Sequence, residues 1–423
     1  MTQPSNRELA ENIARKEIVE MVPYQSARRL FSAAEASGSY DNANSDSSSQ
    51  AQQKIWLNAN EASGPGIYQL TGDSINRYPD FQPDNLLTAY SDYCALPKNN
   101  ILATRGADEG IELIIRTFCR AYQDNILICP PTYGMYAISA ENHGAGIIEV
   151  PLIEVPLVNT KEGNQEQSKV LDINGLKSQV GKTKVVFLCT PGNPVGNILP
   201  KEQLIEALAL FKDSAMVVVD EAYVEFCPET SMAKLINDFP NLIVLRTLSK
   251  AFALAGLRCG FTLANSQIIT LLSKVIAPYP ISAPVAQIAS QALQSDGLEQ
   301  MSIRVQETLI LRQNLSQWLT QQSWCEQVFK ADANFILFKS PFKTQIFDCL
   351  KDQGILIRDQ SKQQQLENCL RISIGSKREL DLLKQVLKQV LKKELKQVPN
   401  EQFVSQSTSS SDSFTTKTAK ENT

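Results

Sequence analysis

The chain has 423 residues, of which 43% are apolar and 20% are charged, and its formal net charge is −4 at pH 7. A chain of this length can bury one large core and a smaller one, so we expect one or two domains without the basic field that nucleic-acid binding requires. No apolar run reaches the roughly 18–20 residues of a membrane span, and the polar N-terminus lacks a signal-peptide core, so we expect no membrane association.

The histidine and cysteine counts further limit the kinds of catalytic and metal site that the chain can form. The only histidine, His143, ends an expected helix and is interpreted as structural. A multi-histidine metal site is therefore impossible, and a Ser-His-Asp triad would depend on this residue alone. The nine cysteines include no C-x-x-C pair, and Cys129 and Cys189 lie inside apolar runs. This pattern is typical of reduced thiols in a cytoplasmic protein without a bound metal.

Two segments are too polar to pack into a core. Residues 37–53 are rich in Ser, Asn, Gln and Asp, and residues 397–423 are rich in Ser, Thr, Lys and Glu. We interpret the first as a flexible insertion and the second as a disordered tail. The residues before the insertion, 1–36, are expected to form an N-terminal arm that belongs to the smaller domain.

Between these segments, short apolar strands alternate with helical patterns. The alternation predicts a mostly parallel sheet covered by helices on both faces, and we place this large domain over residues 54–282. Its expected strands are 125–129, 147–150, 184–189, 216–219, 242–246 and 258–263, and its clearest helices are 107–122 and 201–211.

After about residue 282 the pattern changes to that of a smaller α+β domain, which we extend to residue 396. Its expected elements are a helix at 298–322, a strand at 334–339, a helix at 343–353, strands at 355–358 and 370–374, and a helix at 377–395.

The most informative motif is TLSKAFALAGLRCG, residues 247–260. Its lysine, Lys250, stands between Ser249 and a small apolar run. Desolvation there disfavours the ammonium form and makes the neutral amine available, as a lysine that carries an aldehyde cofactor requires. Thr247, Ser249 and Arg258 around it could hold a phosphate. An isolated Ser-Lys pair would instead be an ordinary surface lysine at a helix start.

Polar residues also follow the neighbouring strands, at the edge where ligands bind in open α/β sheets. Asn193 lies in a Gly/Pro turn after one strand, and Asp220 ends the next, with Tyr223 three residues later. In pyridoxal phosphate chemistry an aspartate pairs with the protonated ring nitrogen, and an asparagine or tyrosine donates to the phenolate oxygen. Taken singly, these would be turn, capping and packing residues. Together with Lys250 they indicate pyridoxal phosphate.

The order and the amino-acid sequences of these segments resemble those of the fold type I aminotransferases, and within them those of the histidinol-phosphate aminotransferases. The resemblance runs from about residue 23 to about residue 393. It implies a mostly parallel seven-stranded sheet covered by helices, a smaller α+β domain, pyridoxal phosphate as cofactor and a homodimer. The motifs that carry it are PYQSARR (23–29), LNANE (57–61), NRYPD (76–80), RGADEGIEL (105–113), PTYGMY (131–136), TPGNPVG (190–196), DEAY (220–223), TLSKAFALAGLRCG, GILIRDQ (354–360) and LRISIG (370–375).

The resemblance implies further cofactor contacts. RGADEGIEL places Gly106, Ala107 and Asp108 at the start of a helix, where exposed N–H groups favour a phosphate, although a plain helix cap is the alternative. Tyr133 is implied to stack on the cofactor ring, and Tyr78 is implied to reach the cofactor phosphate of the neighbouring subunit. From the residues alone, Tyr133 could equally be a core aromatic and Tyr78 a turn residue before proline.

Four residues are assigned to the substrate. Arg371, in LRISIG, lies where related enzymes clamp a substrate carboxylate with an arginine. Histidinol phosphate carries a phosphate ester in that place, so a second cation is reasonable. Arg358 and Tyr24 resemble the family's additional phosphate contacts, and the resemblance also places Asn60 at the substrate. Either arginine alone would more often be a solvated surface residue.

These assignments predict a cytoplasmic transaminase of histidine biosynthesis, which exchanges an amino group between L-histidinol phosphate and 2-oxoglutarate while Lys250 shuttles the proton. One alternative is a related aminotransferase for aromatic or other amino acids, and another is a phospho-amino-acid decarboxylase. A non-catalytic regulator that binds the same cofactor is disfavoured, because fewer than 60 residues precede LNANE and a DNA-binding domain would need that space.

Overall fold

The computed structural model describes residues 19–20, 54–64, 66, 68–72, 75–156 and 167–394. The predicted insertion (37–53), the predicted tail (397–423) and Tyr24 lie outside these residues, as does the predicted arm apart from residues 19–20.

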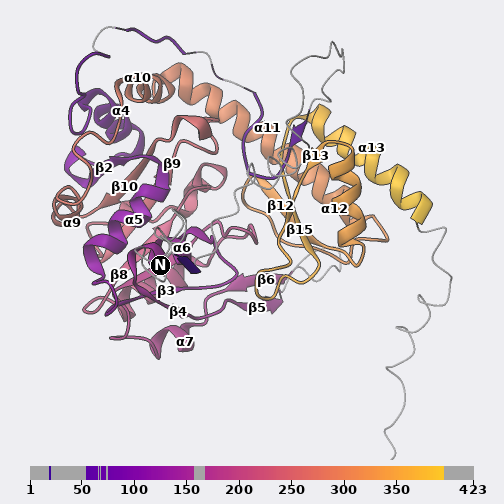
Figure 1. Cartoon of the computed structure of the whole chain (residues 1–423), viewed down its shortest axis with the longest axis horizontal. Coiled ribbons are helices and arrows are strands. Elements are labelled where there is room, and N and C mark those ends of the chain that lie inside the picture. Colours follow the sequence, from indigo (N-terminus) through magenta and orange to yellow (C-terminus); the bar gives the residue numbers. More distant parts are fainter. Residues whose placement is uncertain are drawn as a thin grey trace, which may run out of the picture.

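A seven-stranded sheet organises the larger body of the protein (Figure 1). Its strand order is β2-β10-β9-β8-β7-β3-β4, and every neighbouring pair is parallel except the two that β10 makes with β2 and β9. The predicted seven-stranded, mostly parallel sheet is therefore confirmed. The bounds are β2 Ile101–Thr104, β3 Asn125–Ile128, β4 Gly146–Glu149, β7 Val185–Cys189, β8 Met216–Asp220, β9 Leu242–Thr247 and β10 Gly260–Ala264.

Both faces of this sheet are buried, which explains why its strands are continuous apolar runs. Side chains alternate between the faces of a strand. In β7, Val186 and Leu188 accordingly join one core cluster, whereas Val185 and Phe187 join the other. The first face is covered by α4 (Asp84–Cys94), α8 (Lys201–Leu210) and α10 (Ala283–Ala292), and the second by α5 (Gly106–Phe118), α6 (Met135–His143) and α9 (Ser266–Leu272).

The surroundings of His143 and of the nine cysteines fit a structural role for these residues. His143 is the last residue of α6, and its Nε2 lies 2.8 Å from the carbonyl oxygen of Cys119. All nine cysteines are free thiols, and six of them are buried. Both observations agree with the structural interpretation of these residues.

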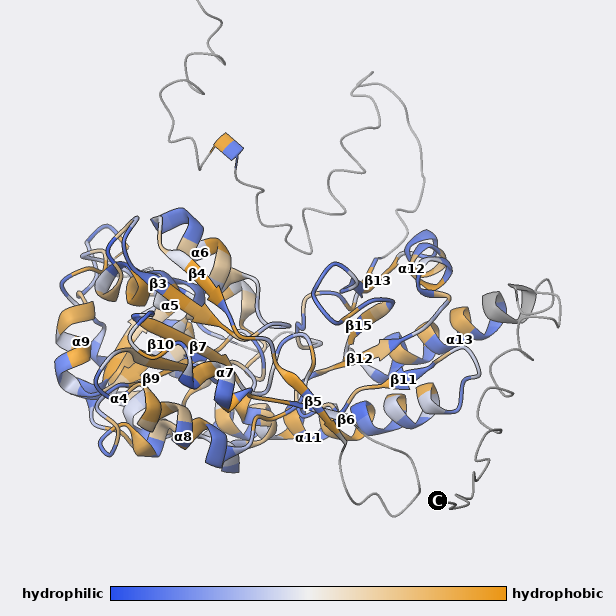
Figure 2. Ribbon diagram, turned by 90° about the horizontal axis from the view of Figure 1, so that it is seen from below, coloured by the Kyte–Doolittle hydropathy of each residue, from blue (hydrophilic) through white to orange (hydrophobic). Residues whose placement is uncertain are grey.

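A four-stranded antiparallel sheet organises the second body, which lies to the right in Figure 2. Its order is β11-β12-β15-β14, and α12 (Lys343–Asp352) and α13 (Lys377–Glu394) pack on it. The long helix α11 (Ser295–Thr320) joins the two bodies, because Val305 packs in the first core whereas Leu315 packs with the second sheet. The domain boundary near residue 282 stays a prediction. The remaining strands are β11 Gln327–Val328, β12 Phe335–Lys339 and β15 Cys369–Ser373.

The strand expected at 355–358 is in fact two strands in different sheets. β13 (Ile355–Leu356) pairs in parallel with β1 (Ile55–Trp56), whereas β14 (Arg358–Asp359) pairs antiparallel with β15. The single-strand prediction was wrong, because an apolar run does not reveal that its backbone changes partner. Sequence reasoning also missed the hairpin of β5 (Ile153–Pro156) and β6 (Gln167–Val170) and the short helix α7 (Ile173–Lys177) that follows it.

Neither a membrane-spanning helix nor a metal-holding cluster is found among the described residues. None of the helices there combines the length and the apolar character needed to cross a bilayer. The same part of the chain contains no group of three or more His, Cys, Asp or Glu side chains placed to hold a metal ion.

Candidate active site

A cavity of about 570 Å³ lies where the carboxyl ends of β7, β8 and β9 face the second body. Because adjacent parallel strands end at the same edge of a sheet, the polar residues that follow them converge there. Most of the predicted site residues line this cavity, namely Asn60, Ala107, Asp108, Tyr133, Asn193, Asp220, Tyr223, Thr247, Ser249, Lys250, Arg258, Arg358 and Arg371.

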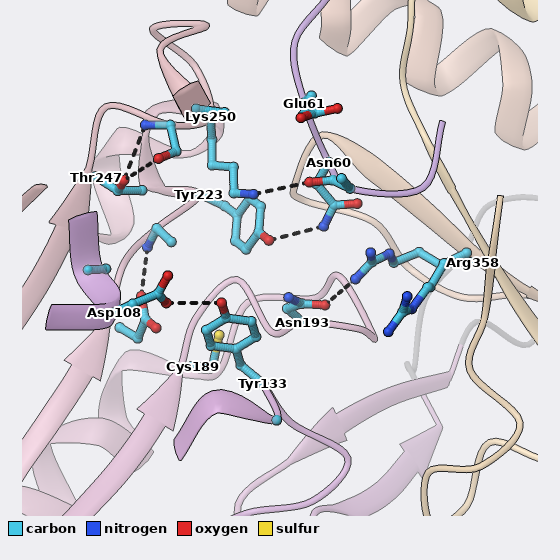
Figure 3. A pocket seen from close by; sticks show the side chains of 18 of the residues that line it. Asn60, Glu61, Asp108, Tyr133, Cys189, Asn193, Tyr223, Thr247, Lys250 and Arg358 are labelled. Carbon is cyan, nitrogen blue, oxygen red and sulfur yellow. Dashed lines mark hydrogen bonds between the residues drawn. The ribbon is translucent and has the colours of Figure 1, made fainter. Parts of the chain in front are cut away.

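Lys250 follows β9, and its amine points into the cavity (Figure 3). The Nζ atom donates a hydrogen bond to the carbonyl oxygen of Ala59 at 3.2 Å and lies 5.6 Å from the centre of the Tyr223 ring. Burial is the main cause that lowers the pKa of this amine to about 8, and the Arg371 guanidinium acts in the same direction. Asp108 and Glu61 partly oppose the shift. A substantial fraction of Lys250 is therefore neutral near physiological pH.

Asp220 ends β8 and is 2% exposed. Its Oδ2 accepts a hydrogen bond from the Tyr136 hydroxyl at 2.6 Å, and its Oδ1 accepts one from the Ala222 N–H at 3.1 Å. Burial raises the pKa of this carboxyl to about 6, although both hydrogen bonds act against that rise. At neutral pH the site thus contains a buried carboxylate that can pair with a cationic ring.

Asn193 and Tyr223 also point into the cavity (Figure 3). The Tyr223 hydroxyl accepts a hydrogen bond from Asn60 Nδ2 at 3.0 Å. Asn60 is buried and held in turn by Ser373, whose Oγ accepts from the Asn60 N–H at 2.8 Å. The Asn193 side-chain oxygen accepts a hydrogen bond from Arg371 Nη1. Both side chains are therefore fixed before any ligand arrives.

One end of the cavity has groups that suit an anion. Helix α5 begins at Gly106, whose φ is +76°, and a Cβ there would lie 2.7 Å from Arg258 Nη2. Arg258 donates to Asp108 Oδ2 at 3.0 Å and to Ser249 Oγ at 3.3 Å, while its side chain remains 48% exposed. The Ser249 N–H is oriented by Thr247 Oγ1 at 3.2 Å. A helix N-terminus beside an accessible guanidinium favours a phosphate.

A second cationic group lies on the four-stranded sheet. Arg358 of β14 and Arg371 of β15 are directly opposite each other, so their side chains share one face, and both line the cavity. Arg371 is 7% exposed, lies 5.2 Å from the centre of the Phe335 ring and donates to the Asn58 carbonyl oxygen at 3.0 Å. In the view of Figure 3, the Lys250 amine lies between Asp108 and Arg358.

Three predicted site residues are not among the described residues that line the cavity. Gly106 lies directly before Ala107 at the start of α5. Tyr78 is 81% exposed and stacks on Tyr279, with ring centres 4.5 Å apart, so it does not take part in the site of its own chain. Tyr24 belongs to the part of the chain that the structure does not describe.

Sequence reasoning also missed several residues at the site. Glu61 and Gln360 lie inside the quoted motifs LNANE and GILIRDQ but had no assigned role, and both line the cavity. Gln363 lines it too, and it follows no recognisable motif. Tyr136, in PTYGMY, resembles any core aromatic in sequence, and only its contact with Asp220 distinguishes it.

Comparisons with known proteins agree with this geometry. The family described as aminotransferase class I and II matches residues 36–387. A histidinol-phosphate aminotransferase of Colwellia psychrerythraea is 62% identical over 387 residues, which cover 90% of this chain and 99% of the relative. The chain belongs to the histidinol-phosphate aminotransferase family.

Other members of this family and its fold are more distant. A histidinol-phosphate aminotransferase of Yersinia enterocolitica is 46% identical over 90% of this chain and 92% of its own. Among solved structures, the histidinol-phosphate aminotransferase of Sinorhizobium meliloti in complex with pyridoxal-5'-phosphate superposes with a TM-score of 0.73. It is 23% identical, and the match covers 90% of this chain and 98% of that one. At that identity the superposition shows a shared fold.

The residues of the cavity fit pyridoxal phosphate. The absence of a side chain at Gly106 leaves room beside Arg258 for a phosphate. The desolvated Lys250 amine suits an aldehyde, and the buried Asp220 carboxylate suits a protonated ring nitrogen.

Proposed function

We propose that this chain catalyses pyridoxal-phosphate-dependent transamination between L-histidinol phosphate and 2-oxoglutarate. In the biosynthetic direction, L-glutamate would supply the amino group and imidazole acetol phosphate would accept it, as part of histidine biosynthesis. The observation that carries the proposal is a desolvated amine, Lys250, that shares one cavity with two separate cationic groups. Two anion sites match a cofactor and a substrate that each carry a phosphate. The name of the relative that is 62% identical supports the same activity.

Each predicted cofactor contact then receives a role. Arg258, Ser249, Thr247 and the first N–H groups of α5 would hold the cofactor phosphate, and Asp220 would pair with the ring nitrogen. Tyr133, whose hydroxyl donates to Asp108 Oδ1 at 3.0 Å, would cover one face of the ring. Asn193 and Tyr223 would donate to the phenolate oxygen.

When bound, pyridoxal phosphate supplies an electron sink for the bond pair released at the substrate carbon. Lys250 would carry the proton in this reaction, because its Nζ could take the proton from the substrate carbon and deliver it again within the site. The pKa of about 8 makes the amine a base that is partly neutral at working pH. Tyr223, 5.6 Å from the amine, limits where Nζ can move.

The two arginines on the second sheet would bind the substrate. Arg371, fixed by Asn193 and by the Asn58 carbonyl, would take the carboxylate of glutamate or one side of the substrate phosphate. Arg358, directly across from it, would add a second cation for the phosphate alone. This arrangement explains how one site accepts two substrates that differ in their anionic group.

A half-reaction assay tests the proposed function. The absorbance of the bound cofactor is followed after single additions of histidinol phosphate, histidine, phenylalanine or aspartate. We expect histidinol phosphate to convert the cofactor to its amine form far faster than the other three. Faster conversion by phenylalanine would favour an aromatic aminotransferase, and release of carbon dioxide would favour a decarboxylase.

We further propose that the protein is a homodimer in which the partner subunit's Tyr78 completes the cofactor phosphate site. Tyr78 is exposed, as are Leu70 and Ile75 earlier in the same stretch of chain and Tyr279, on which Tyr78 stacks. With 81% of its surface exposed, Tyr78 is accessible to a second copy of the chain. The cytoplasmic location stays a prediction.

Hybrid dimers test whether Tyr78 acts across subunits. We expect Lys250→Ala chains to be inactive and Tyr78→Phe chains to be weakened. A mixed dimer contains one site with both residues intact only if Tyr78 serves the other subunit. An equal mixture should regain about a quarter of the wild-type activity, because half of the dimers are hybrids with one intact site each. If hybrids form, as shown by tagged-chain purification, and activity stays at the level of the separate mutants, Tyr78 does not act in trans.

A further inference from the structure

A tyrosine behind the cavity contacts the buried Asp220, which lines it, and the proposed chemistry does not yet use this tyrosine. Tyr136 lies in the first turn of α6 and is fully buried, and its hydroxyl donates to Asp220 Oδ2 at 2.6 Å. Its ring is stacked on Phe187, with centres 4.7 Å apart and planes inclined by 11°. The edge contact with Tyr133, at 5.6 Å, closes its other side. The side chain therefore has little freedom to withdraw from the carboxylate.

The hydrogen bond from Tyr136 affects the ionisation of the buried Asp220 carboxyl group. Burial alone favours the neutral acid, and a hydrogen bond donated to a carboxylate favours the ionised form. Bonds of this charge-assisted kind are short and roughly twice as strong as neutral ones. When a carboxyl group and a ring nitrogen share one proton, the proton resides on the more basic of the two. A donor that makes Asp220 less basic therefore leaves the proton on the ring nitrogen.

We propose that Tyr136 is a positioning residue for Asp220, whose hydroxyl holds the carboxylate ionised and aimed so that an aromatic ring nitrogen beside it stays protonated. The second hydrogen bond to Asp220, from the Ala222 N–H, comes from the backbone and fixes the other oxygen. Tyr136 is thus the side chain that sets the charge at this end of the cavity. The inference rests on the proposed function, because it concerns the cofactor that Asp220 would contact.

The test uses the full-length protein loaded with pyridoxal phosphate that carries ¹⁵N in the ring. Tyr136→Phe keeps the stacked ring and removes only the hydroxyl. We expect the ¹⁵N signal of the bound cofactor to move from the protonated position toward the unprotonated one. Asp220→Asn, which removes the carboxylate, marks the unprotonated limit. Cofactor affinity, measured by quenching of protein fluorescence, should fall roughly tenfold or more.

Tyr90→Phe is the matched control. Tyr90 is also buried and stacked, on Phe261, but it belongs to α4 and the core on the opposite face of the sheet. Loss of its hydroxyl should leave the ¹⁵N signal unchanged. A Tyr136→Phe protein that binds cofactor with the wild-type signal would overturn the inference and leave the proposed function intact. A wild-type protein that binds no pyridoxal phosphate would instead overturn the proposed function.

A second variant covers the case in which Tyr136→Phe does not fold. Fluorination of the Tyr136 ring by incorporation of 3-fluorotyrosine keeps its shape and makes the hydroxyl a stronger donor. The ¹⁵N signal at neutral pH should then lie at or beyond the protonated position of the wild type. A ¹⁵N signal that moves toward the unprotonated position would contradict the proposed role of the hydroxyl.

Discussion

Lys250→Ala is expected to fold and to retain pyridoxal phosphate but to lose transamination by at least about 10²–10⁴-fold, the usual contribution of a positioned proton carrier. Among the described residues that line the cavity, Lys250 is the only lysine, so none of these residues is an equivalent group. Borohydride reduction of the wild type should attach the cofactor to the peptide that contains Lys250. Single-turnover absorbance with histidinol phosphate measures the loss of rate.

Lys274→Ala is the matched control for this variant. Lys274 is an exposed lysine that follows α9 and does not line the cavity. Its removal should change neither the rate nor the labelled peptide. Labelling at Lys274 or Lys184 in the wild type would contradict the assignment of Lys250.

The depressed pKa of Lys250 gives its reaction a characteristic pH dependence. Only the neutral amine can add to an aldehyde, and the neutral fraction rises with pH through the pKa. With a pKa of about 8, roughly half of the amines are neutral at pH 8, so the rate of cofactor capture by the apo-protein should rise up to that region and then level off. A rate that keeps rising to pH 10 would show an unperturbed lysine.

Arg358→Ala is expected to impair the phosphorylated substrate selectively. A charge-assisted hydrogen bond contributes about 1.5–3 kcal/mol, so kcat/KM for histidinol phosphate should fall roughly 10- to 100-fold. The loss for glutamate should be much smaller, because Arg371 remains in place, held by the Asn58 carbonyl. Unphosphorylated histidinol should be a poor substrate of the wild type and should respond little to the substitution. Steady-state kinetics with the three substrates measures these ratios.

Arg378→Ala controls for the loss of a positive charge. Arg378 is exposed on α13 and is not part of the cavity, so its removal should leave all three substrates unaffected. Equal losses for histidinol phosphate and glutamate in Arg358→Ala would identify Arg358 as a structural residue. The choice of substrate would then have to depend on other groups of the cavity.

The sequence by itself determined the alternation of buried strands and helices and the polar residues at the strand ends. Asn193, Asp220 and Lys250 could be predicted as neighbours because parallel strands covered on both faces must be continuous apolar runs, and their carboxyl ends share an edge. The helix start at Gly106, where we propose an anion site, could be predicted for the same kind of local reason. Each of these patterns spans only a few residues, so it can be recognised in the sequence without knowledge of the fold.

Only the tertiary structure decided which distant residues meet. Tyr136 bonds Asp220 across 84 positions, and Arg371 bonds Asn193 across 178. The strand expected at 355–358 divides between two sheets, and that division places Arg358 directly opposite Arg371. Periodicity reveals that a side chain is buried but not what it is buried against, because strand register and helix packing depend on the whole chain. The partners that fix the charge of each site residue are for this reason absent from any local pattern.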